Sequence, residues 1–427
     1  MLTVELCKKY FPIRTRGISK LRLAVVSPFL DRLHGTENCI IEQIERLAFS
    51  DGWEIHLYSQ RIDQIQLHPS RQELAQGGRI IWHPISKVPG PHILNYLWWI
   101  FLNHIRRWYE ERSGKDQVDL TYSPGINCLD ADAIVVHMVF HEFFARVAPE
   151  LRFGKIPLRN WYLLLHRKLY YRLVMFLEAR VYRNPDVQLV GVSSLVAKQL
   201  KVHFGRSDVV VIPNGVDTKR FSPEKRLARR PTARKRFDYS ESDFVLLLIG
   251  NDWKKKGLDF LLGAIALLSD LPMRVLVVGS DDPTIYRQSL HDLGLNQQVR
   301  FESLSGEVLA FYGAADVYVG PSLEDAFGLP IVEAMACGLP VVASIHAGAS
   351  EYVDDAKTGF LLSEPRDSAE IARIVRKLYI EDSEREKIGL AAAQHMRANC
   401  DWDQNAARTR KFLEGVFRER KCRLSGE

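Results

Sequence analysis

Short apolar runs alternate along the chain with longer segments of helical periodicity. The first half contains apolar, β-branched runs at 21–26, 53–58, 80–83, 118–122, 133–137 and 187–192. The second half contains similar runs at 208–213, 244–250, 273–279, 298–301, 316–320 and 339–344. Runs this continuous, separated by helix-length segments, are typical of strands buried on both faces of parallel sheets. The pattern therefore predicts an α/β fold in which the βαβ arrangement occurs twice.

The length of 427 residues suits two domains better than one core. The pattern breaks at residues 203–207, so we expect one Rossmann-like domain over 1–207 and a second over 208–400. Residues 401–420 have the pattern of an amphipathic helix. In a two-domain chain of this kind we expect this helix, within the terminal segment 401–427, to cross back onto the first domain.

Composition narrows the class of protein only modestly. The hydrophobic share of 46% and the charged share of 26% are those of a globular protein. The net charge is +6, and basic residues gather at 8–20, 152–183 and 225–236. This excess favours an anionic partner, which could be a sugar nucleotide, a membrane surface or a nucleic acid. The basic residues match no recognised nucleic-acid module, so we expect no nucleic-acid partner.

Cysteine usage and the N-terminus bear on the compartment. The cysteines form no C-x-x-C pair, which predicts neither a disulfide framework nor a zinc ribbon; they are Cys7, Cys39, Cys128, Cys337, Cys400 and Cys422. The first residues lack the continuous apolar region of a signal peptide. No stretch reaches the roughly 20 apolar residues of a spanning helix. We therefore expect a cytoplasmic protein, and peripheral contact with the inner face of the cell membrane stays open as an alternative.

The segment 321–344 carries the most informative chemistry. It follows a predicted strand and leads into a helix expected to start near Pro330, with Glu333 in the first turn. A carboxylate at the carboxyl end of a parallel sheet can accept hydrogen bonds from two adjacent sugar hydroxyls. The loop 326–329 would place backbone N–H groups beside a helix N-terminus, which suits an anion or a sugar oxygen. Alternatively, Glu333 favours the helix dipole and the glycines are turns.

This segment resembles the donor motif of the retaining GT-B glycosyltransferases of family four, also called glycosyl transferases group 1. The two carboxylates of that motif correspond to Asp325 and Glu333 in D-A-F-G-L-P-I-V-E. The resemblance implies that Asp325 and the backbone of Phe327, Gly328 and Leu329 hold the transferred sugar, and that Glu333 holds the ribose. Asp325 stands where the family has Glu, and the adjacent Glu324 is the alternative holder of the sugar.

A second segment, residues 250–264, stands directly after a predicted strand and opens a helix. Cations and glycine at such a turn can hold a diphosphate. The segment resembles the G-R-x-x-x-x-K-G motif of the same family through Gly250, Lys256 and Gly257. Asn251 replaces the Arg, and Lys255 is the substitute cation. The alternative is a solvated lysine run, although lysines at a helix start oppose the dipole and call for an anion.

Smaller matches follow in the family's order. They are I-P-N-G-V-D at 212–217, the region 346–361 with Glu351 and Gly359, and Trp402 before the last helix. The resemblance is specific over about residues 208–405 and weaker, though ordered, before that. It implies two Rossmann-like domains facing across a cleft, the first binding the acceptor and the second the donor nucleotide.

The first half supplies its own candidates. Gly35 opens a predicted helix and resembles the family's N-terminal glycine loop, where a ligand approaches the backbone. His137 follows a predicted strand, and the resemblance implies that it supports the transferred sugar. His137 and His141, four residues apart, could instead bind a metal, but no third ligand is nearby. His141 also fits a partly buried histidine with a hydrogen-bonded partner.

Asp130 and Asp132 form a D-x-D, the metal-binding pattern of the other glycosyltransferase fold. Here the motif precedes a strand instead of following one, so we interpret it as a turn. We therefore expect no metal and no cofactor, since a nucleotide sugar is a substrate.

Two segments combine aromatic, apolar and basic residues, at 93–115 and 154–183. Such helices favour an anionic membrane surface. Alternatively, their apolar faces cover the first sheet and their cations are solvated.

The resemblance implies a retaining, metal-independent glycosyltransferase that moves a sugar from a nucleotide sugar to a cell-envelope glycan or lipid-linked acceptor. Lys255 and Lys256 would stabilise the leaving diphosphate. The alternatives are a non-catalytic relative that binds a membrane or a partner, and another GT-B enzyme such as an epimerase or a phosphorylase.

Overall fold

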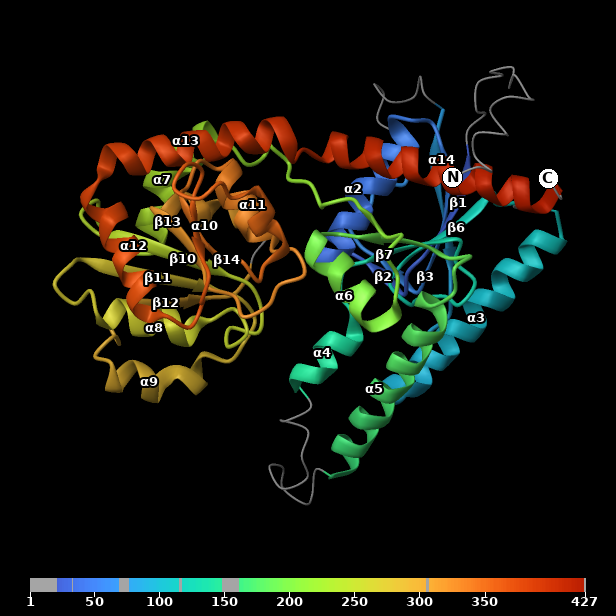
Figure 1. Ribbon diagram of the computed structural model, residues 1–427, viewed down its shortest axis with the longest axis horizontal. Coiled ribbons are helices and arrows are strands. Elements are labelled where there is room, and N and C mark those ends of the chain that lie inside the picture. The colour runs from blue at the N-terminus through green and yellow to red at the C-terminus, as the bar shows by residue number, and fades with distance from the viewer. Residues whose placement is uncertain are drawn as a thin grey trace.

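The computed structural model describes residues 21–425 apart from residue 33 and residues 69–76, 115–116, 148–160 and 305–306. The basic cluster at 8–20, Cys7 and residues 154–160 of the second aromatic and basic segment lie outside the described residues. Two large parallel sheets lie side by side, joined along one edge of the molecule by long helices (Figure 1). The predicted α/β architecture with two Rossmann-like units is confirmed.

The first unit holds a seven-stranded sheet. Its elements are β1 (Arg22–Val26), β2 (Phe29–Leu30), α2 (Gly35–Phe49), β3 (Glu54–Ser59), β4 (Arg61–Ile62), β5 (Arg79–Pro84), α3 (His92–Arg112), β6 (Leu120–Pro124), β7 (Ala133–Val136), α4 (Phe140–Val147), α5 (Trp161–Tyr182), β8 (Gln188–Gly191), α6 (Ser194–Phe204) and β9 (Val210–Val211). The sheet order is β5-β3-β1-β6-β7-β8-β9, while β2 and β4 form a separate pair.

One expectation about this sheet is wrong. The run 208–213 was expected to open the second domain, but β9 pairs with β8, so it is the last strand of the first sheet. The main-chain bond from Ile212 N–H to the Gly191 carbonyl continues this ladder at 3.0 Å. The break at 203–207 is only the end of α6, where Gly205 takes the left-handed conformation that closes many helices.

The second unit holds a six-stranded sheet. Its elements are α7 (Pro223–Arg236), β10 (Phe244–Ile249), α8 (Leu258–Ala266), β11 (Met273–Val278), η4 (Pro283–Tyr286), α9 (Arg287–Asp292), β12 (Val299–Glu302), α10 (Val308–Ala314), β13 (Val317–Gly320), α11 (Leu329–Ala336), β14 (Val341–Ser344), η5 (Gly348–Tyr352), β15 (Phe360–Leu362), α12 (Ser368–Ile380), α13 (Asp382–Asn399) and α14 (Trp402–Ser425). The order β12-β11-β10-β13-β14-β15 reverses direction between β10 and β13, where open α/β sheets bind ligands.

The terminal helix crosses between the units, as predicted. In Figure 1, α13 lies on the second unit, and α14 continues over the first. There Asn405 accepts a hydrogen bond from Gln43 at 3.0 Å, and Arg420 donates to Asp132 at 2.7 Å. Leu413 is fully buried on this helix. Because α14 follows α13 with almost no intervening chain, it fixes the two units against each other.

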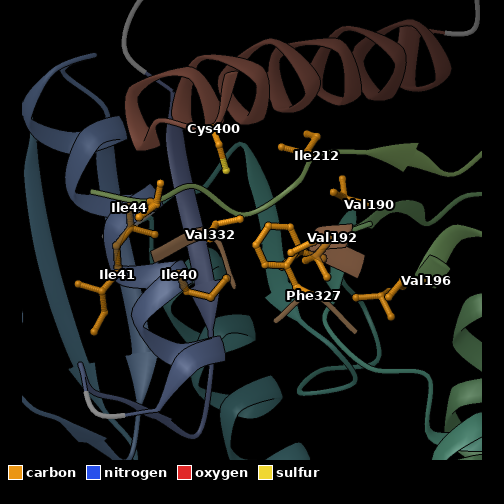
Figure 2. Packing of buried hydrophobic residues seen from close by; sticks show 14 of the residues in the cluster. Ile40, Ile41, Ile44, Val190, Val192, Val196, Ile212, Phe327, Val332 and Cys400 are labelled. Atoms are coloured by element: carbon orange, nitrogen blue, oxygen red, sulfur yellow. The ribbon is translucent and has the colours of Figure 1, made fainter. Parts of the chain in front are cut away.

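Hydrophobic packing also runs between the units. One cluster includes Phe327 and Val332 of the second unit together with Val192 and Ile40 of the first (Figure 2). A second cluster lies wholly in the second unit, around β10, β11 and α8. A core shared across the junction resists opening, because separating the units would expose apolar surface.

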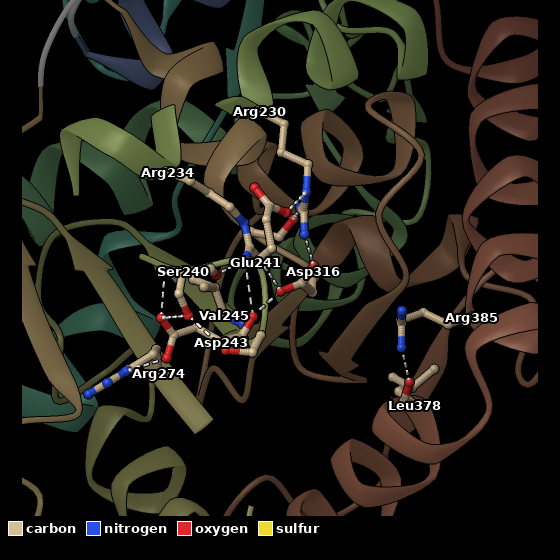
Figure 3. Close-up of polar contacts among 12 residues, drawn as sticks. Arg230, Arg234, Ser240, Glu241, Asp243, Val245, Arg274, Asp316, Leu378 and Arg385 are labelled. Carbon is tan, nitrogen blue, oxygen red and sulfur yellow. Dashed lines mark hydrogen bonds and ion pairs between the residues drawn. The ribbon is translucent and has the colours of Figure 1, made fainter. Parts of the chain in front are cut away.

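The basic cluster at 225–236 lies on α7 and is partly structural. Arg230 and Arg234 form ion pairs with Asp316 at 2.7 and 2.6 Å, and Asp316 also accepts from the Val245 N–H (Figure 3). Arg226 donates to the Cys337 carbonyl at 2.9 Å. These guanidinium groups hold α7 against the second sheet, so only the remaining cations of the cluster are available to an anionic partner.

The helices α3 and α5 run side by side away from the first sheet (Figure 1). Both expose large apolar side chains: Leu94, Leu97, Trp98, Phe101, Ile105, Trp108 and Tyr109 on α3, and Tyr162, Leu163, Leu165, Leu169 and Phe176 on α5. We call these residues the apolar face. Their other sides pack inward, with Trp99 and Tyr182 buried. Within the described ranges, no helix is both long and apolar enough to cross a bilayer.

Candidate functional site

The glycine turn, residues 250–257, links β10 to α8 at the carboxyl end of the second sheet. Gly250 and Gly257 have φ of 144° and 80°, which disfavour other residues. A Cβ on Gly257 would lie 2.0 Å from the Pro321 carbonyl oxygen, and one on Gly250 would lie 2.7 Å from Cε of Lys256. The turn therefore packs directly on the chain after β13, and the Lys256 side chain lies along it.

Two lysines of this turn pair with two adjacent carboxylates. Lys255 Nζ lies 3.3 Å from Glu324, and Lys256 Nζ forms a close ion pair with Asp325. Glu324 also accepts a hydrogen bond from Gln199 of α6 at 3.3 Å. The structure thus brings together four of the predicted site residues. It gives each carboxylate a different cation and links Glu324 to the first unit.

The acidic loop, residues 324–329, is held by its own backbone. Asp325 donates its N–H to the His346 carbonyl at 2.9 Å, and its carboxylate accepts from the Phe327 N–H at 3.3 Å. Gly328, with φ of 92°, precedes the first residue of α11, and Phe327 is buried. These bonds fix the loop beside the N-terminus of α11, where an anion or a sugar oxygen is favoured.

Glu333 lies further along α11 than predicted. The helix begins at Leu329, so Glu333 is in its second turn, and the expectation of a first-turn position is wrong. The preceding loop reaches the helix earlier because Gly328 turns the chain sharply. Glu333 accepts a hydrogen bond from the Tyr312 hydroxyl of α10. Burial raises the pKa of Glu333 to about 7, while Tyr312 and Arg220 act in the opposite direction.

Asn251, which replaces the Arg of the family motif, has a hydrogen-bond partner within the second unit. Its side-chain oxygen accepts from the Ser280 N–H at 2.9 Å, which joins the glycine turn to the end of β11. The neighbouring Trp253 donates its backbone N–H to Asp281. Asn251 therefore holds the two loops together, and Lys255 and Lys256 are the cations of the turn that face the acidic loop.

The first unit meets the acidic loop from the other side. A Cβ on Gly35 would lie 3.4 Å from Leu329, so the start of α2 faces this loop. The predicted helix opening at Gly35 is confirmed. Ser193 donates its hydroxyl hydrogen to the Ala326 carbonyl at 2.7 Å, and Glu351 accepts from the Ser194 N–H at 2.7 Å. The predicted donor residues thus lie at the junction of both units.

His137 lies immediately after β7 in a cavity of about 240 Å³ within the first unit. Both ring nitrogens are buried and make no well-formed hydrogen bond to the described residues, although the Asn214 side chain lies near the ring. Burial lowers the pKa of His137 to about 4, while the side chain of Asn214 opposes this shift. A neutral imidazole with two unpaired nitrogens is able to both donate and accept a hydrogen bond.

His141 belongs to a different contact. Its Nδ1 pairs with Glu178 of α5, and the same carboxylate accepts from the N–H groups of Phe140 at 2.7 Å and of His141 at 3.0 Å. The Glu178 side chain is only 1% exposed. Burial raises the pKa of Glu178, although the hydrogen bonds that it accepts act in the opposite direction. His141 is therefore a partly buried histidine with a hydrogen-bonded partner, as the second of the two sequence interpretations predicts.

The D-x-D carboxylates are each paired with an arginine. Asp130 accepts from Arg107 at 2.6 Å, and Asp132 accepts from Arg420 of α14 at 2.7 Å. Asp132 also accepts from the Thr121 N–H at 2.8 Å, and the two residues lie in the connection between β6 and β7. Asp130 thus holds elements of the first unit together, and Asp132 holds α14 against that unit.

Three residues that contact the candidate site were not predicted from the sequence. Tyr312, Gln199 and Glu178 each contact a predicted site residue or its loop, but they come from helices elsewhere in the chain. Glu178 stands in an aromatic and basic helix, where a carboxylate resembles a solvated charge. Its burial depends on contacts with the start of α4, a short helix that we did not predict from the sequence.

Both halves of the chain match known glycosyltransferase families. Residues 229–395 match the family described as glycosyl transferases group 1, and residues 33–220 match glycosyltransferase family 4. The D-inositol 3-phosphate glycosyltransferase of Geodermatophilus obscurus is 37% identical over 243 residues, which cover 53% of this chain and 52% of that protein. Lipopolysaccharide glucosyltransferase WaaG of Escherichia coli is 29% identical over 170 residues, 39% of this chain and 46% of WaaG.

Solved structures extend the likeness to nearly the whole fold. The crystal structure of WaaG, a glycosyltransferase involved in lipopolysaccharide biosynthesis, matches 91% of this chain and 98% of that one, with a TM-score of 0.67 and 18% identity. Anabaena Alr3699/HepE in complex with UDP-glucose matches 92% of this chain and all of that one, with a TM-score of 0.64 and 19% identity. By sequence, the chain spans about half the length of the curated relatives that it matches.

Proposed function

We propose that this chain, whose two halves match models of glycosyltransferase families and whose fold is that of solved GT-B glycosyltransferases, transfers a sugar from a nucleotide-sugar donor to a cell-envelope glycan or lipid-linked acceptor. The observation that carries the proposal is the pairing of Lys255 with Glu324 and of Lys256 with Asp325 at the carboxyl end of the second sheet. Cations for a diphosphate and carboxylates for sugar hydroxyls stand together there, at the topological switch point.

Each residue then has a distinct role toward the donor. Lys255 and Lys256 stabilise the negative charge that develops on the leaving diphosphate, as a metal does in other transferases. Asp325, or Glu324 beside it, accepts hydrogen bonds from the transferred sugar, together with the backbone of residues 327–329. Glu333 accepts hydrogen bonds from the ribose hydroxyls. His137 and the start of α2 at Gly35 approach the sugar and the diphosphate from the first unit.

Transfer proceeds with retention of anomeric configuration. The bond between the anomeric carbon and the diphosphate oxygen breaks, and the acceptor oxygen bonds to that carbon from the same face. The departing phosphate oxygen takes the proton of the acceptor hydroxyl. No carboxylate nucleophile is needed, and the lysines supply the charge for a step without a metal.

The test measures release of nucleoside diphosphate from a panel of nucleotide sugars, with and without EDTA and with and without lipid extract. We expect release from one donor, insensitivity to EDTA and stimulation by lipid. Lys256→Ala should lower kcat about 100-fold, in the range seen when one group that stabilises transition-state charge is removed. Lys254→Ala, the exposed lysine of the same run, is the matched control. Absence of both release and donor binding would refute the proposal in favour of a non-catalytic relative.

We propose further that the apolar face of α3 and α5 lies on the cytoplasmic surface of an anionic membrane. Its support is exposure: Phe101 and Leu165 are 59% and 61% exposed, on helices that also carry Arg112, Arg167 and Lys168. Amphipathic surfaces of this kind bind membranes through buried apolar area plus attraction to anionic lipid.

Sedimentation with lipid vesicles tests this contact. The protein should bind phosphatidylcholine vesicles that contain anionic lipid and bind pure phosphatidylcholine less. The double variant Leu97→Ser and Phe101→Ser should lose most of this binding. Leu390→Ser is the control, because Leu390 is a comparably exposed leucine on α13 of the second unit. Equal binding by both variants would contradict the assigned face.

A further inference from the structure

The cavity that holds His137 lies wholly within the first unit. Its lining comes from the first turn of α2, the ends of β6 and β7, and the helices α3 and α5, and it includes Thr36, Tyr96, Asn127, His137, Tyr170 and Glu178. Thr36 follows Gly35, which faces Leu329 of the acidic loop. A ligand in this cavity would therefore be next to the sugar held by the acidic loop.

The size of the cavity limits its occupant. A volume of about 240 Å³ corresponds to roughly eight water molecules at liquid density. That is room for about one monosaccharide ring inside the pocket, and the rest of a longer acceptor would extend through the open mouth. Two aromatic rings shape the wall, since Tyr96 and Tyr170 stand edge to face with centroids 5.9 Å apart. The Tyr96 hydroxyl donates a hydrogen bond to the Ile126 carbonyl at 2.7 Å. Tyr96 therefore offers a ligand mainly the apolar surface of its ring.

The polar groups of the cavity suit hydroxyl groups. The two ring nitrogens of His137 call for one hydrogen-bond acceptor and one donor. Two different hydroxyl groups can provide them, because each hydroxyl can both donate and accept. A buried polar atom left without a partner costs roughly 1–3 kcal/mol, so a hydroxylated ligand recovers free energy here.

The charges of the cavity disfavour an anion. None of the described residues that line it is Lys or Arg, while Glu178 contributes a carboxyl group from α5. A phosphate or carboxylate on the ligand would have to enter a small, mostly apolar space without a cation. Moving an unpaired charge into such a space is far costlier than moving a hydroxyl.

We propose that this cavity is the acceptor subsite and that it takes an uncharged, hydroxylated ring, a sugar residue without phosphate or carboxylate. This inference rests on the proposed glycosyltransferase function and adds the chemical class of its acceptor. The aromatic walls contact the faces of the ring, and His137 receives one of its hydroxyls beside the donor sugar. Any charge on the acceptor molecule lies outside the cavity, toward solvent or lipid.

The experiment uses the full chain, its nucleotide-sugar donor and two matched acceptor sets, methyl hexosides and the corresponding hexose 6-phosphates. Donor hydrolysis without acceptor is recorded in parallel. We expect neutral hexosides to be glycosylated with kcat/KM at least 10-fold above that of the phosphates. Tyr170→Ala should raise the KM for the hexoside about 10-fold and leave the KM for the donor unchanged.

A charge-insertion pair sharpens the test. Met138 lines the cavity yet is 45% exposed, so Met138→Lys adds a cation at its mouth without disturbing the core. This variant should increase kcat/KM for the hexose phosphates. Leu129→Lys, which adds the same charge in an exposed position outside the lining, should not.

The outcomes separate this inference from the function beneath it. Phosphorylated hexoses preferred by the wild type, or an equal effect of the two lysine variants, would overturn the neutral-acceptor assignment. Donor hydrolysis that continues while neutral hexosides neither bind nor react would also overturn it and leave the transferase function standing. Loss of donor hydrolysis and donor binding with every nucleotide sugar would count against the proposed function itself.

Discussion

The protonation of Glu333 should control donor affinity across neutral pH. Its pKa is raised to about 7 because its surroundings on α11 shield the partly buried side chain from solvent, and its described hydrogen-bond partner is Tyr312. An ionised carboxylate accepts hydrogen bonds from two ribose hydroxyls through charge-assisted bonds, which are roughly twice as strong as neutral ones. A protonated carboxyl gives up part of that acceptor capacity. Donor binding should therefore strengthen as pH rises through 7.

The magnitude follows from the pKa. With a pKa of about 7, roughly one carboxyl in eleven is ionised at pH 6 and roughly ten in eleven at pH 8. If only the ionised form holds the ribose, the Kd for the donor falls about 10-fold between these values. That is about 1.4 kcal/mol of binding free energy. Glu333→Gln cannot titrate. Its Kd for the donor should therefore be higher than that of the wild type at pH 8 and should not change with pH.

Calorimetry with the intact nucleotide sugar is the appropriate assay. A free nucleoside diphosphate has a terminal phosphate that titrates near pH 6, which would imitate the effect, whereas both phosphates of the nucleotide sugar are esterified. Measurements at pH 6, 7 and 8 on wild type and Glu333→Gln separate the carboxyl from other groups. The reasoning is refuted if the wild type shows no dependence on pH, or if the Gln variant shows the same dependence.

Three further changes test the fold and the site. The free energy of unfolding of the wild type, compared with that of Glu333→Gln, should fall by about 3 kcal/mol as pH rises from 4.5 to 7, because the folded state holds the Glu333 proton up to a pKa of about 7 whereas the unfolded state releases it near 4.5. Urea unfolding at several pH values measures this difference. The same pH dependence in both proteins would contradict it. Asp316→Ala removes the carboxylate shared by Arg230 and the buried Arg234 and should cost about 3–5 kcal/mol in urea unfolding. Leu413→Ala, at a fully buried position on α14, should cost about 2–5 kcal/mol, and a loss below 1 kcal/mol would show that this helix does not hold the units together.

Most strands of the fold could be predicted because a buried strand leaves an apolar pattern in its own residues. A run such as 244–250 is apolar throughout, and a strand covered on both faces requires that pattern whatever lies around it. The position of β9 could not be predicted in this way. Val210 and Val211 are compatible with either sheet, and only pairing with β8 decides between them. The boundary between the units is therefore a tertiary property that no local pattern contains.

The donor half of the site was predictable for a related reason. Gly250, Gly257 and Gly328 are needed by backbone conformations that few other residues adopt, so they mark the turns that carry the lysines and carboxylates. The partners of those side chains were not predictable. Tyr312 reaches Glu333 from another helix, 21 residues earlier, and it is this contact and burial that set the acidity of the carboxyl.

The acceptor half depends even more on such distant contacts. Glu178 accepts from the N–H of Phe140, 38 residues earlier, and so holds the start of α4 directly after the loop that carries His137. Because α5 also carries much of the apolar face, one helix connects the proposed membrane surface with the wall of the cavity. A neutral ring at the end of a lipid-linked molecule would enter between these two features. The surface and the cavity thus favour the same class of acceptor through independent physical causes, one through exposed apolar area and the other through the absence of cations among the described lining residues.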